Sequence, residues 1–131
     1  MSERQEPTTI GLSDQSHEIL RQLKTEGYFR EMQDAYRFAI AFAARTSPDI
    51  ASVPDVRSPN TIFNIGTIDP DRRIRVLIES VLGVPEGQIY KTAEKLAEAG
   101  VIALGKKLES GTLNLSEVVT NLGASPAGGS V

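Results

Sequence analysis

The feature that most constrains the fold is an apolar stripe at helical spacing, enclosed by a start signal and a stop signal. The stripe comprises Ile74, Leu77, Ile78, Val81 and Leu82, a spacing that places these side chains on one face of an α-helix. Asp69 is the expected N-cap, and Pro70 fits the first helical position, where a missing N–H costs nothing. Gly83 is expected to end the helix. The sequence therefore predicts an amphipathic helix over residues 70–82.

Two more amphipathic helices are expected before this one. Ser13 or Asp14 can cap the first, and Gly27 closes it. Its stripe is Ile19, Leu20 and Leu23. The second runs from about Glu31 to Arg45, and one of its faces carries Met32, Ala35, Tyr36, Ala39, Ile40 and Ala43. The small alanines on this face would let another helix approach closely.

A further helix is expected to start near Glu86, with Ile89, Tyr90, Ala93, Leu96 and Ala97 on one face. The pattern leaves open whether it stops at Gly100 or continues to Leu108, because glycine costs a helix only about 1 kcal/mol. Ser116 could cap a last short turn over residues 117–122.

The remaining segments predict one short strand, one loop and one tail. Residues 8–12 alternate polar and apolar side chains, as a strand does. Residues 46–67 contain three prolines and predict a loop, within which residues 61–66 are apolar enough to be extended and anchored on the core. Residues 123–131 predict a disordered tail. The expected architecture is mainly α with one short N-terminal strand, in a single domain over residues 1–122.

Composition removes several classes of function. The chain of 131 residues has no cysteine and one histidine, His17, which excludes disulfide frameworks, thiolate zinc sites and paired-histidine metal motifs. No nucleophile elbow or phosphate-cradling loop is present, and capping explains Asp69 and Asp71. We therefore expect no catalytic residues, no cofactor and no metal. The polar N-terminus lacks a secretory signal, and no apolar stretch approaches the roughly 20 residues of a membrane span, so we expect a cytoplasmic protein.

Basic residues are the candidate binding groups. The whole chain carries 14 Lys and Arg against 17 Asp and Glu, but the stretch from 72 to 107 holds seven basic and four acidic residues. These basic residues are the candidate nucleic-acid contacts: Arg72, Arg73, Arg75, Lys91, Lys95, Lys106 and Lys107. The alternative is a set of solvated helix faces with local ion pairs, such as Arg75 with Glu79 and Lys91 with Glu94.

Residues 8–45 resemble a ribbon-helix-helix module of the MetJ/Arc type. The matching elements are Thr8-Thr-Ile-Gly-Leu-Ser-Asp, Ile19-Leu20-x-x-Leu23, Glu26-Gly27-Tyr28, and a second helix containing Ala35 and Ile40. The resemblance implies that strands from two subunits pair and that their outward side chains read the major groove. Here the outward set would be Thr9 and Gly11, which offer none of the bidentate contacts that specify a base.

A broader resemblance covers most of residues 8–108. Phe63-Asn64-Ile65-Gly66-Thr67 before a capped helix and the later Leu96-Ala-Glu-Ala-Gly100-Val101 are similar to the small DndE proteins of bacterial DNA sulfur modification, or phosphorothioation. This resemblance implies a mostly helical, oligomeric accessory protein that binds the DNA backbone without reading sequence and works beside the modifying enzymes. The loop at 46–67 would then separate the ribbon-helix-helix-like part from a helical part at 68–108.

The leading expectation is therefore a non-enzymatic accessory protein of a DNA modification or defence system, bound to DNA and to other subunits as a homo-oligomer. Two alternatives stay open. The acidic balance and the alanine-rich second helix would also suit an assembly subunit without DNA contact. The N-terminal resemblance alone would suit a ribbon-helix-helix repressor or antitoxin.

Overall fold

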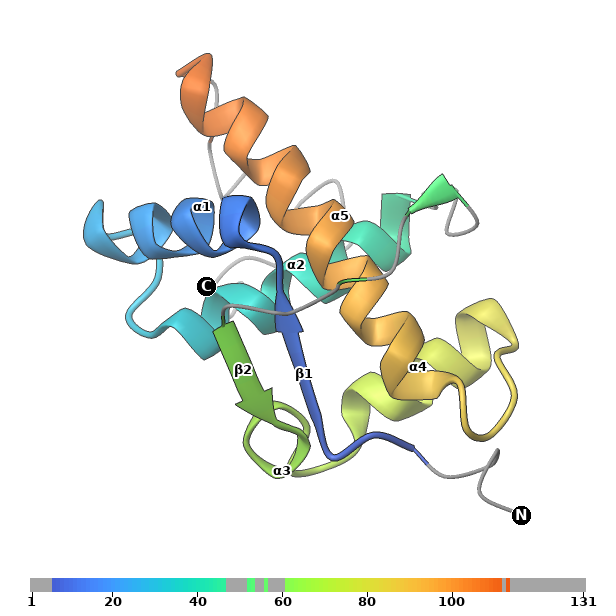
Figure 1. The fold of residues 1–131 in the computed structure, drawn as a ribbon. Coiled ribbons are helices and arrows are strands. Elements are labelled where there is room, and N and C mark those ends of the chain that lie inside the picture. The colour runs from blue at the N-terminus through green and yellow to red at the C-terminus, as the bar shows by residue number, and fades with distance from the viewer. Residues whose placement is uncertain (1–5, 47–51, 54–55, 57–60, 112, 114–131) are drawn as a thin grey trace, which may run out of the picture.

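Five helices and a two-stranded antiparallel sheet form the part of the chain that the computed structural model describes (Figure 1). The described residues are 6–46, 52–53, 56, 61–111 and 113. The elements in order are β1 (Thr9–Leu12), α1 (Asp14–Thr25), α2 (Met32–Thr46), β2 (Thr61–Asn64), α3 (Ile65–Ile68), α4 (Arg73–Leu82) and α5 (Ile89–Glu109). The predicted class, mainly α with a short N-terminal strand, is confirmed.

The long helix α5 crosses α2 at very short range. A Cβ atom on Gly100 would lie 2.2 Å from the Ala39 carbonyl oxygen, so only glycine fits at this crossing. The prediction that the small residues of α2 admit another helix is confirmed. The same contact resolves the ambiguity at Gly100, because α5 runs through it to Glu109. The close approach explains why the helix carries a residue that weakens it.

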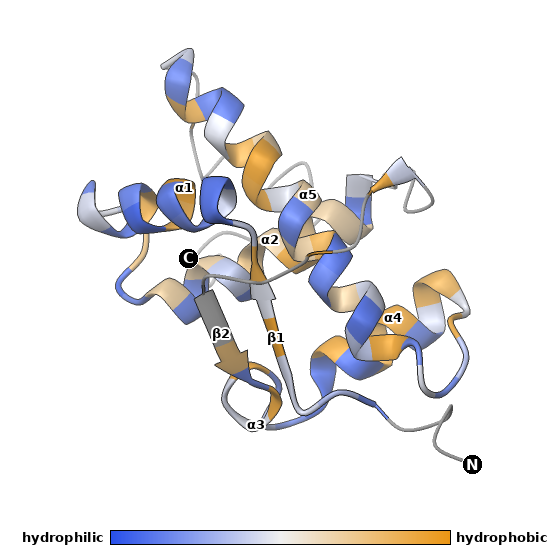
Figure 2. Cartoon of the chain, viewed as in Figure 1, coloured by the Kyte–Doolittle hydropathy of each residue, from blue (hydrophilic) through white to orange (hydrophobic). Residues whose placement is uncertain are grey.

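The apolar faces of the helices meet in one core. Figure 2 shows hydrophobic and hydrophilic residues alternating along the helices, as expected of amphipathic elements. The largest fully buried side chains include Leu20, Leu23, Tyr36, Ile40, Ile78, Leu96 and Leu104. Residues from α1, α2, α4 and α5 thus share one interior. This packing fixes the position of α4 beside the start of α5.

Strand β1 has partners on both of its edges. One edge pairs with β2, with Ile10 opposite Phe63. On the other edge, the Gly11 N–H donates to Glu94 Oε2 at 2.8 Å, and the Tyr36 hydroxyl donates to the Gly11 carbonyl oxygen at 3.0 Å. The strand that the ribbon-helix-helix resemblance would pair between subunits therefore pairs within its own chain. The expected outward position of Gly11 was wrong, because the residue is buried under these contacts, whereas Thr9 is exposed.

The junction between β1 and α1 is held by a buried carboxylate of α5. Ser13 is the N-cap of α1, as predicted, and its side chain accepts the Ser16 N–H. Glu98 accepts the Ser13 N–H at 3.1 Å, the Ser13 hydroxyl at 2.7 Å and the Ser16 hydroxyl at 2.9 Å. Because Glu98 is only 8% exposed, these charged hydrogen bonds form away from competing water.

The start of α4 differs from the prediction. The helix begins at Arg73, with Arg72 rather than Asp69 as its N-cap, because a positive φ of 62° at Arg72 interrupts the helical path. Asp69 still serves the first turn, since its carboxylate accepts the N–H groups of Ile74 at 2.9 Å and Arg75 at 3.0 Å. Gly83 ends the helix in the left-handed conformation, as predicted.

The predicted loop at 46–67 is confirmed in part, and the predicted C-terminal segments are not described by the structure. Within the 46–67 loop, the expected extended piece forms β2, and the four-residue helix α3, which the pattern did not predict, follows it. The proposed final turn at 117–122 and the tail at 123–131 lie outside the described residues.

We expect Gly100→Ala to destabilise the protein by about 3 kcal/mol, because the new methyl group forces two helix backbones apart. Gly105→Ala is the matched control. Its methyl group would meet the Ile19 side chain, 2.8 Å from Cδ1 and 3.0 Å from Cγ2, and no backbone atom, so its cost in stability should be clearly smaller than that of Gly100→Ala. Urea unfolding measures both. Equal stabilities for the two variants would contradict the crossing geometry.

We expect Glu98→Ala to lower the free energy of unfolding by about 3 kcal/mol, because it leaves a backbone N–H and two serine hydroxyls without their acceptor. Glu18→Ala, which removes an exposed partner of Arg21 on α1, should leave the urea midpoint of unfolding close to that of wild type. The comparison uses urea unfolding at neutral pH. A Glu98 variant as stable as the Glu18 variant would show that the carboxylate does not hold the junction.

Candidate functional site

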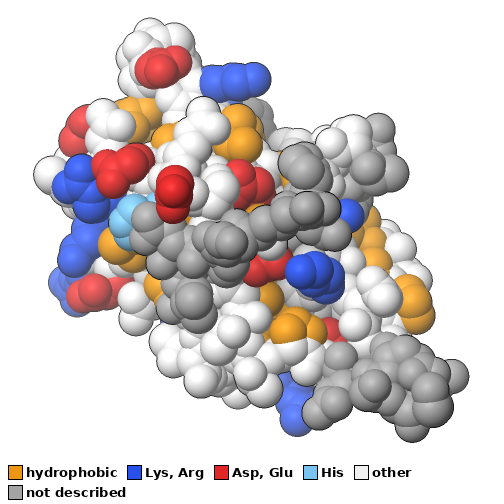
Figure 3. All heavy atoms as spheres, viewed as in Figure 1, with side chains coloured by type: hydrophobic (Ala, Val, Ile, Leu, Met, Phe, Trp, Pro, Cys, Tyr) orange, Lys and Arg blue, Asp and Glu red, His pale blue; other side chains and the backbone are white. Residues whose placement is uncertain are grey.

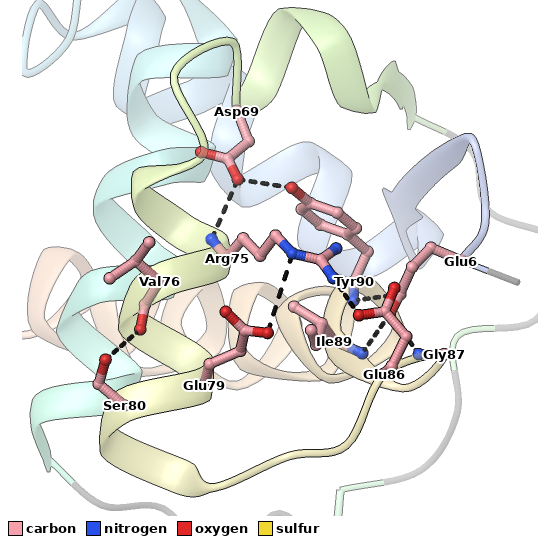
Figure 4. A network of polar contacts seen from close by, with 10 residues as sticks. All are labelled: Glu6, Asp69, Arg75, Val76, Glu79, Ser80, Glu86, Gly87, Ile89 and Tyr90. Atoms are coloured by element: carbon pink, nitrogen blue, oxygen red, sulfur yellow. Dashed lines mark hydrogen bonds and ion pairs between the residues drawn. The ribbon is translucent and has the colours of Figure 1, made fainter. Parts of the chain in front are cut away.

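A polar groove of about 540 Å³ lies where α3, the turn before α4 and the first turn of α5 meet. Its polar lining is formed by Asp69, Arg72, Arg75, Glu86 and Tyr90, and Ile65 and Pro70 add apolar wall. Figure 4 shows the Asp69 carboxylate and the Tyr90 hydroxyl pointing toward each other, and the Arg75 side chain extending from α4 toward Glu79 and Glu86. Residues from α3, from the turn before α4, from the first turn of α4 and from the start of α5 thus meet at one place.

Asp69 forms hydrogen bonds to both α4 and α5 at the groove. In addition to the two N–H groups of α4, its Oδ2 accepts the Tyr90 hydroxyl at 2.7 Å. The side chain is buried, with only 5% of the residue exposed. Burial, together with the hydrogen bond to Asp69, raises the pKa of the Tyr90 hydroxyl to about 12. The phenol therefore stays protonated and donates to Asp69 throughout the neutral range.

Arg75 forms the side of the groove. Its guanidinium forms ion pairs with Glu86 and, at 3.9 Å, with Glu79, which confirms the predicted local pair. Desolvation works against the charged form, but the attraction of Glu86 and Glu79 outweighs it and raises the pKa of Arg75. Since its side chain is only 19% exposed, Arg75 is committed to internal contacts.

The start of α5 is capped from outside the helix by Glu6. Its carboxylate accepts the N–H groups of Gly87 at 2.6 Å, Ile89 at 3.2 Å and Tyr90 at 2.9 Å. Asp69 and Asp71 perform the same task for α4. Carboxylates of the chain thus fill both helix starts beside the groove, where free N–H groups would otherwise attract an external anion.

The structure brings three of the seven predicted basic residues together. Arg72 and Arg73 are exposed at the start of α4, with Arg75 one turn further on. Arg73 lies 3.0 Å from Asp71, but its side chain is 88% exposed, and such a pair in water is weak.

The four lysines do not join this group. Lys91 contacts Glu94 at 3.4 Å, which confirms that predicted local pair, and Lys95 is half-buried further along α5. Lys106 and Lys107 lie in the last turn of α5, roughly 24 Å from Lys91 at 1.5 Å per residue. Figure 3 shows Lys and Arg side chains in separate places on one face, with acidic and neutral side chains between them. The seven predicted basic residues therefore divide between the start of α4 and the length of α5.

Sequence reasoning missed the carboxylates that bind backbone groups, namely Glu6, Glu94 and Glu98. It treated Glu94 and Glu98 only as acidic residues on a solvated face. One signal was available for Glu94, because it follows Tyr90 by four residues and so lies on the apolar face of α5. A carboxylate within an apolar stripe indicates a buried partner.

Within the described residues, no group of three or more His, Asp or Glu side chains is arranged to hold a metal ion. None of the helices in that part of the chain is long and apolar enough to cross a membrane. The chain matches no protein-family model, no curated protein and no solved structure. Inference about function therefore starts from the residues themselves and from the resemblances given above.

We expect the stability of the protein to fall as pH rises from about 10 to 12. In that window an unfolded tyrosine releases its proton while folded Tyr90 keeps it, so the raised pKa favours the unfolded state increasingly with pH. Tyr90→Phe should cost about 1 kcal/mol at pH 8 through the lost hydrogen bond. The difference in unfolding free energy between wild type and Tyr90→Phe should shrink by about 1 kcal/mol by pH 11, because only the wild type loses this stabilisation. Urea unfolding at both pH values tests this, and a constant difference would contradict it.

Proposed function

We propose that the chain is a cytoplasmic, non-enzymatic accessory protein that binds the DNA backbone without strong sequence preference, as an oligomer beside DNA-modifying enzymes. The observation that carries this proposal is the exposed arginine pair, Arg72 and Arg73, at the start of α4. Arginine is well suited to phosphate, because its planar guanidinium can donate two parallel hydrogen bonds.

The use of acidic residues inside the fold supports the proposal. A net charge of −3 would oppose binding to a polyanion if all the acids faced solvent. Five described acidic residues, Glu6, Asp69, Asp71, Glu94 and Glu98, instead accept backbone N–H groups. The net charge of the whole chain therefore does not describe the charge that a ligand meets at the start of α4.

The geometry favours contacts to phosphate over contacts to bases. Thr9 is exposed on β1, but Gly11 is buried and has no side chain, so this strand presents little that could read a base. A repressor of the ribbon-helix-helix type would also need β1 to pair with a second copy. Both edges of β1 are already occupied within the chain.

The resemblance to the DNA sulfur-modification family supplies the biological setting of the proposal. The positions that carry it have clear roles in this fold: Phe63 packs on Tyr36 with ring centroids 4.8 Å apart, and Gly100 permits the crossing with Ala39. The DNA contact itself rests on the arginine pair.

A second candidate function is an assembly subunit without DNA contact. The observation that favours it is the exposure of two large apolar side chains of α4, Val76 at 57% and Val81 at 52%. Exposed apolar side chains can contribute to a protein-binding surface. The two candidates differ in their response to DNA and salt.

We expect the protein to bind two unrelated 20-base-pair duplexes with similar affinity, measured by fluorescence anisotropy. Raising salt from 50 to 200 mM should weaken binding about tenfold if two phosphates are contacted per chain. Replacing Arg72 and Arg73 together by alanine should remove most of the binding to both duplexes alike.

The matched control is the double variant Arg21→Ala and Lys24→Ala, which removes the same charge from the exposed face of α1. It should bind about as well as wild type. An equal loss in this control would mean that overall charge, not the start of α4, carries the binding. No binding at 50 mM salt would contradict the DNA proposal and favour the assembly subunit.

A further inference from the structure

Arg72 has a backbone conformation that the chain otherwise reserves for glycine. Its φ is 62° and its ψ is 22°, in the left-handed region. The other positive-φ residues in the described part of the chain are Gly27, Gly83, Gly87 and Gly111. In this region an L side chain brings its Cβ close to the following carbonyl oxygen, and arginine lacks the short polar group with which Asn and Asp compensate. The fold therefore holds Arg72 in a backbone conformation that is sterically unfavourable for its side chain.

The backbone hydrogen bonds made at position 72 do not need a side chain. The Arg72 N–H donates to the Asp69 carbonyl oxygen at 3.3 Å, and its own carbonyl oxygen accepts the Val76 N–H at 3.0 Å, which starts α4. Glycine would make both hydrogen bonds without the steric cost. The reason for an arginine must then lie in its side chain.

Within the described residues, the polar atoms of the Arg72 side chain are not used to hold the fold together. Arg73 pairs with Asp71 and Arg75 pairs with Glu86, whereas within the described residues no hydrogen bond or ion pair engages the Arg72 guanidinium. Arg72 is exposed and lines the polar groove. Two carboxylates line this groove: Asp69 is bound to two N–H groups and a hydroxyl, and Glu86 pairs with Arg75.

We propose that Arg72 binds a phosphodiester group of the DNA backbone at the mouth of this groove, and that its strained conformation persists because this side chain is needed for binding. The inference rests on the proposed function and assigns a residue and a place to it. The helix terminus is not the binding element, since Asp69 and Asp71 occupy the first N–H groups of α4. The guanidinium itself supplies the donors, in the bidentate form that phosphate accepts.

The test compares Arg72→Gly with Arg72→Ala. Both variants lose the guanidinium, but only glycine relieves the strain. Both should bind a 20-base-pair duplex about tenfold more weakly at 50 mM salt. The slope of log affinity against log salt should also become shallower by about one unit, because one phosphate contact is lost. Arg72→Gly should unfold at a higher urea concentration than wild type, and Arg72→Ala should not. Arg21→Ala, which removes an exposed arginine from α1, should leave affinity within about twofold.

The outcomes distinguish a failure of the Arg72 assignment from a failure of the proposed function on which it rests. If the wild type binds DNA and Arg72→Gly binds equally well, the assignment of Arg72 is overturned while the proposed function stands. If Arg72→Gly unfolds at lower urea than wild type, the side chain has a structural role and the assignment fails. If the wild type itself does not bind the duplex at 50 mM salt, the proposed function and this inference fall together.

Discussion

The arrangement of the N-terminal half depends on two buried carboxylates of α5. Glu94 accepts the N–H of Gly11, and Glu98 accepts the N–H of Ser13 and the hydroxyls of Ser13 and Ser16. These groups lie more than 80 residues from their partners in sequence, so they join the two ends of the described chain. Without them, polar backbone groups of β1 would be buried without partners, at a cost comparable to several hydrogen bonds.

The same principle recurs at the groove, where Asp69 and Glu6 bind the starts of α4 and α5. An acidic chain thus uses part of its charge as internal hydrogen-bond acceptor. This links the fold to the proposed function, because the arginines at the start of α4 are left facing solvent while nearby carboxylates are occupied. It also shows why a charge total is a poor guide to a ligand: the position of each charge decides what a partner meets.

Much of the fold could be predicted because its signals are local. The stripes of α1, α2 and α5, the Ser13 cap and the Gly83 stop all depend on residues within a few positions of one another. The start of α4 could not be placed, because nothing in the sequence marks an arginine that adopts a positive φ. The site divides in the same way. The arginine cluster was visible from adjacency, whereas the contacts of Asp69 with Tyr90 and of Glu6 with the start of α5 depend on tertiary packing.

The central claim is that the carboxylates of α5 hold β1 within its own chain. Amide hydrogen exchange measured by NMR tests it most directly, because the N–H groups of Gly11 and Ser13 have no other acceptor among the described backbone groups. The account predicts that both amides exchange as slowly as those in the middle of α2 and α5, through near-global unfolding. Exchange at the rate of an unstructured peptide would contradict it.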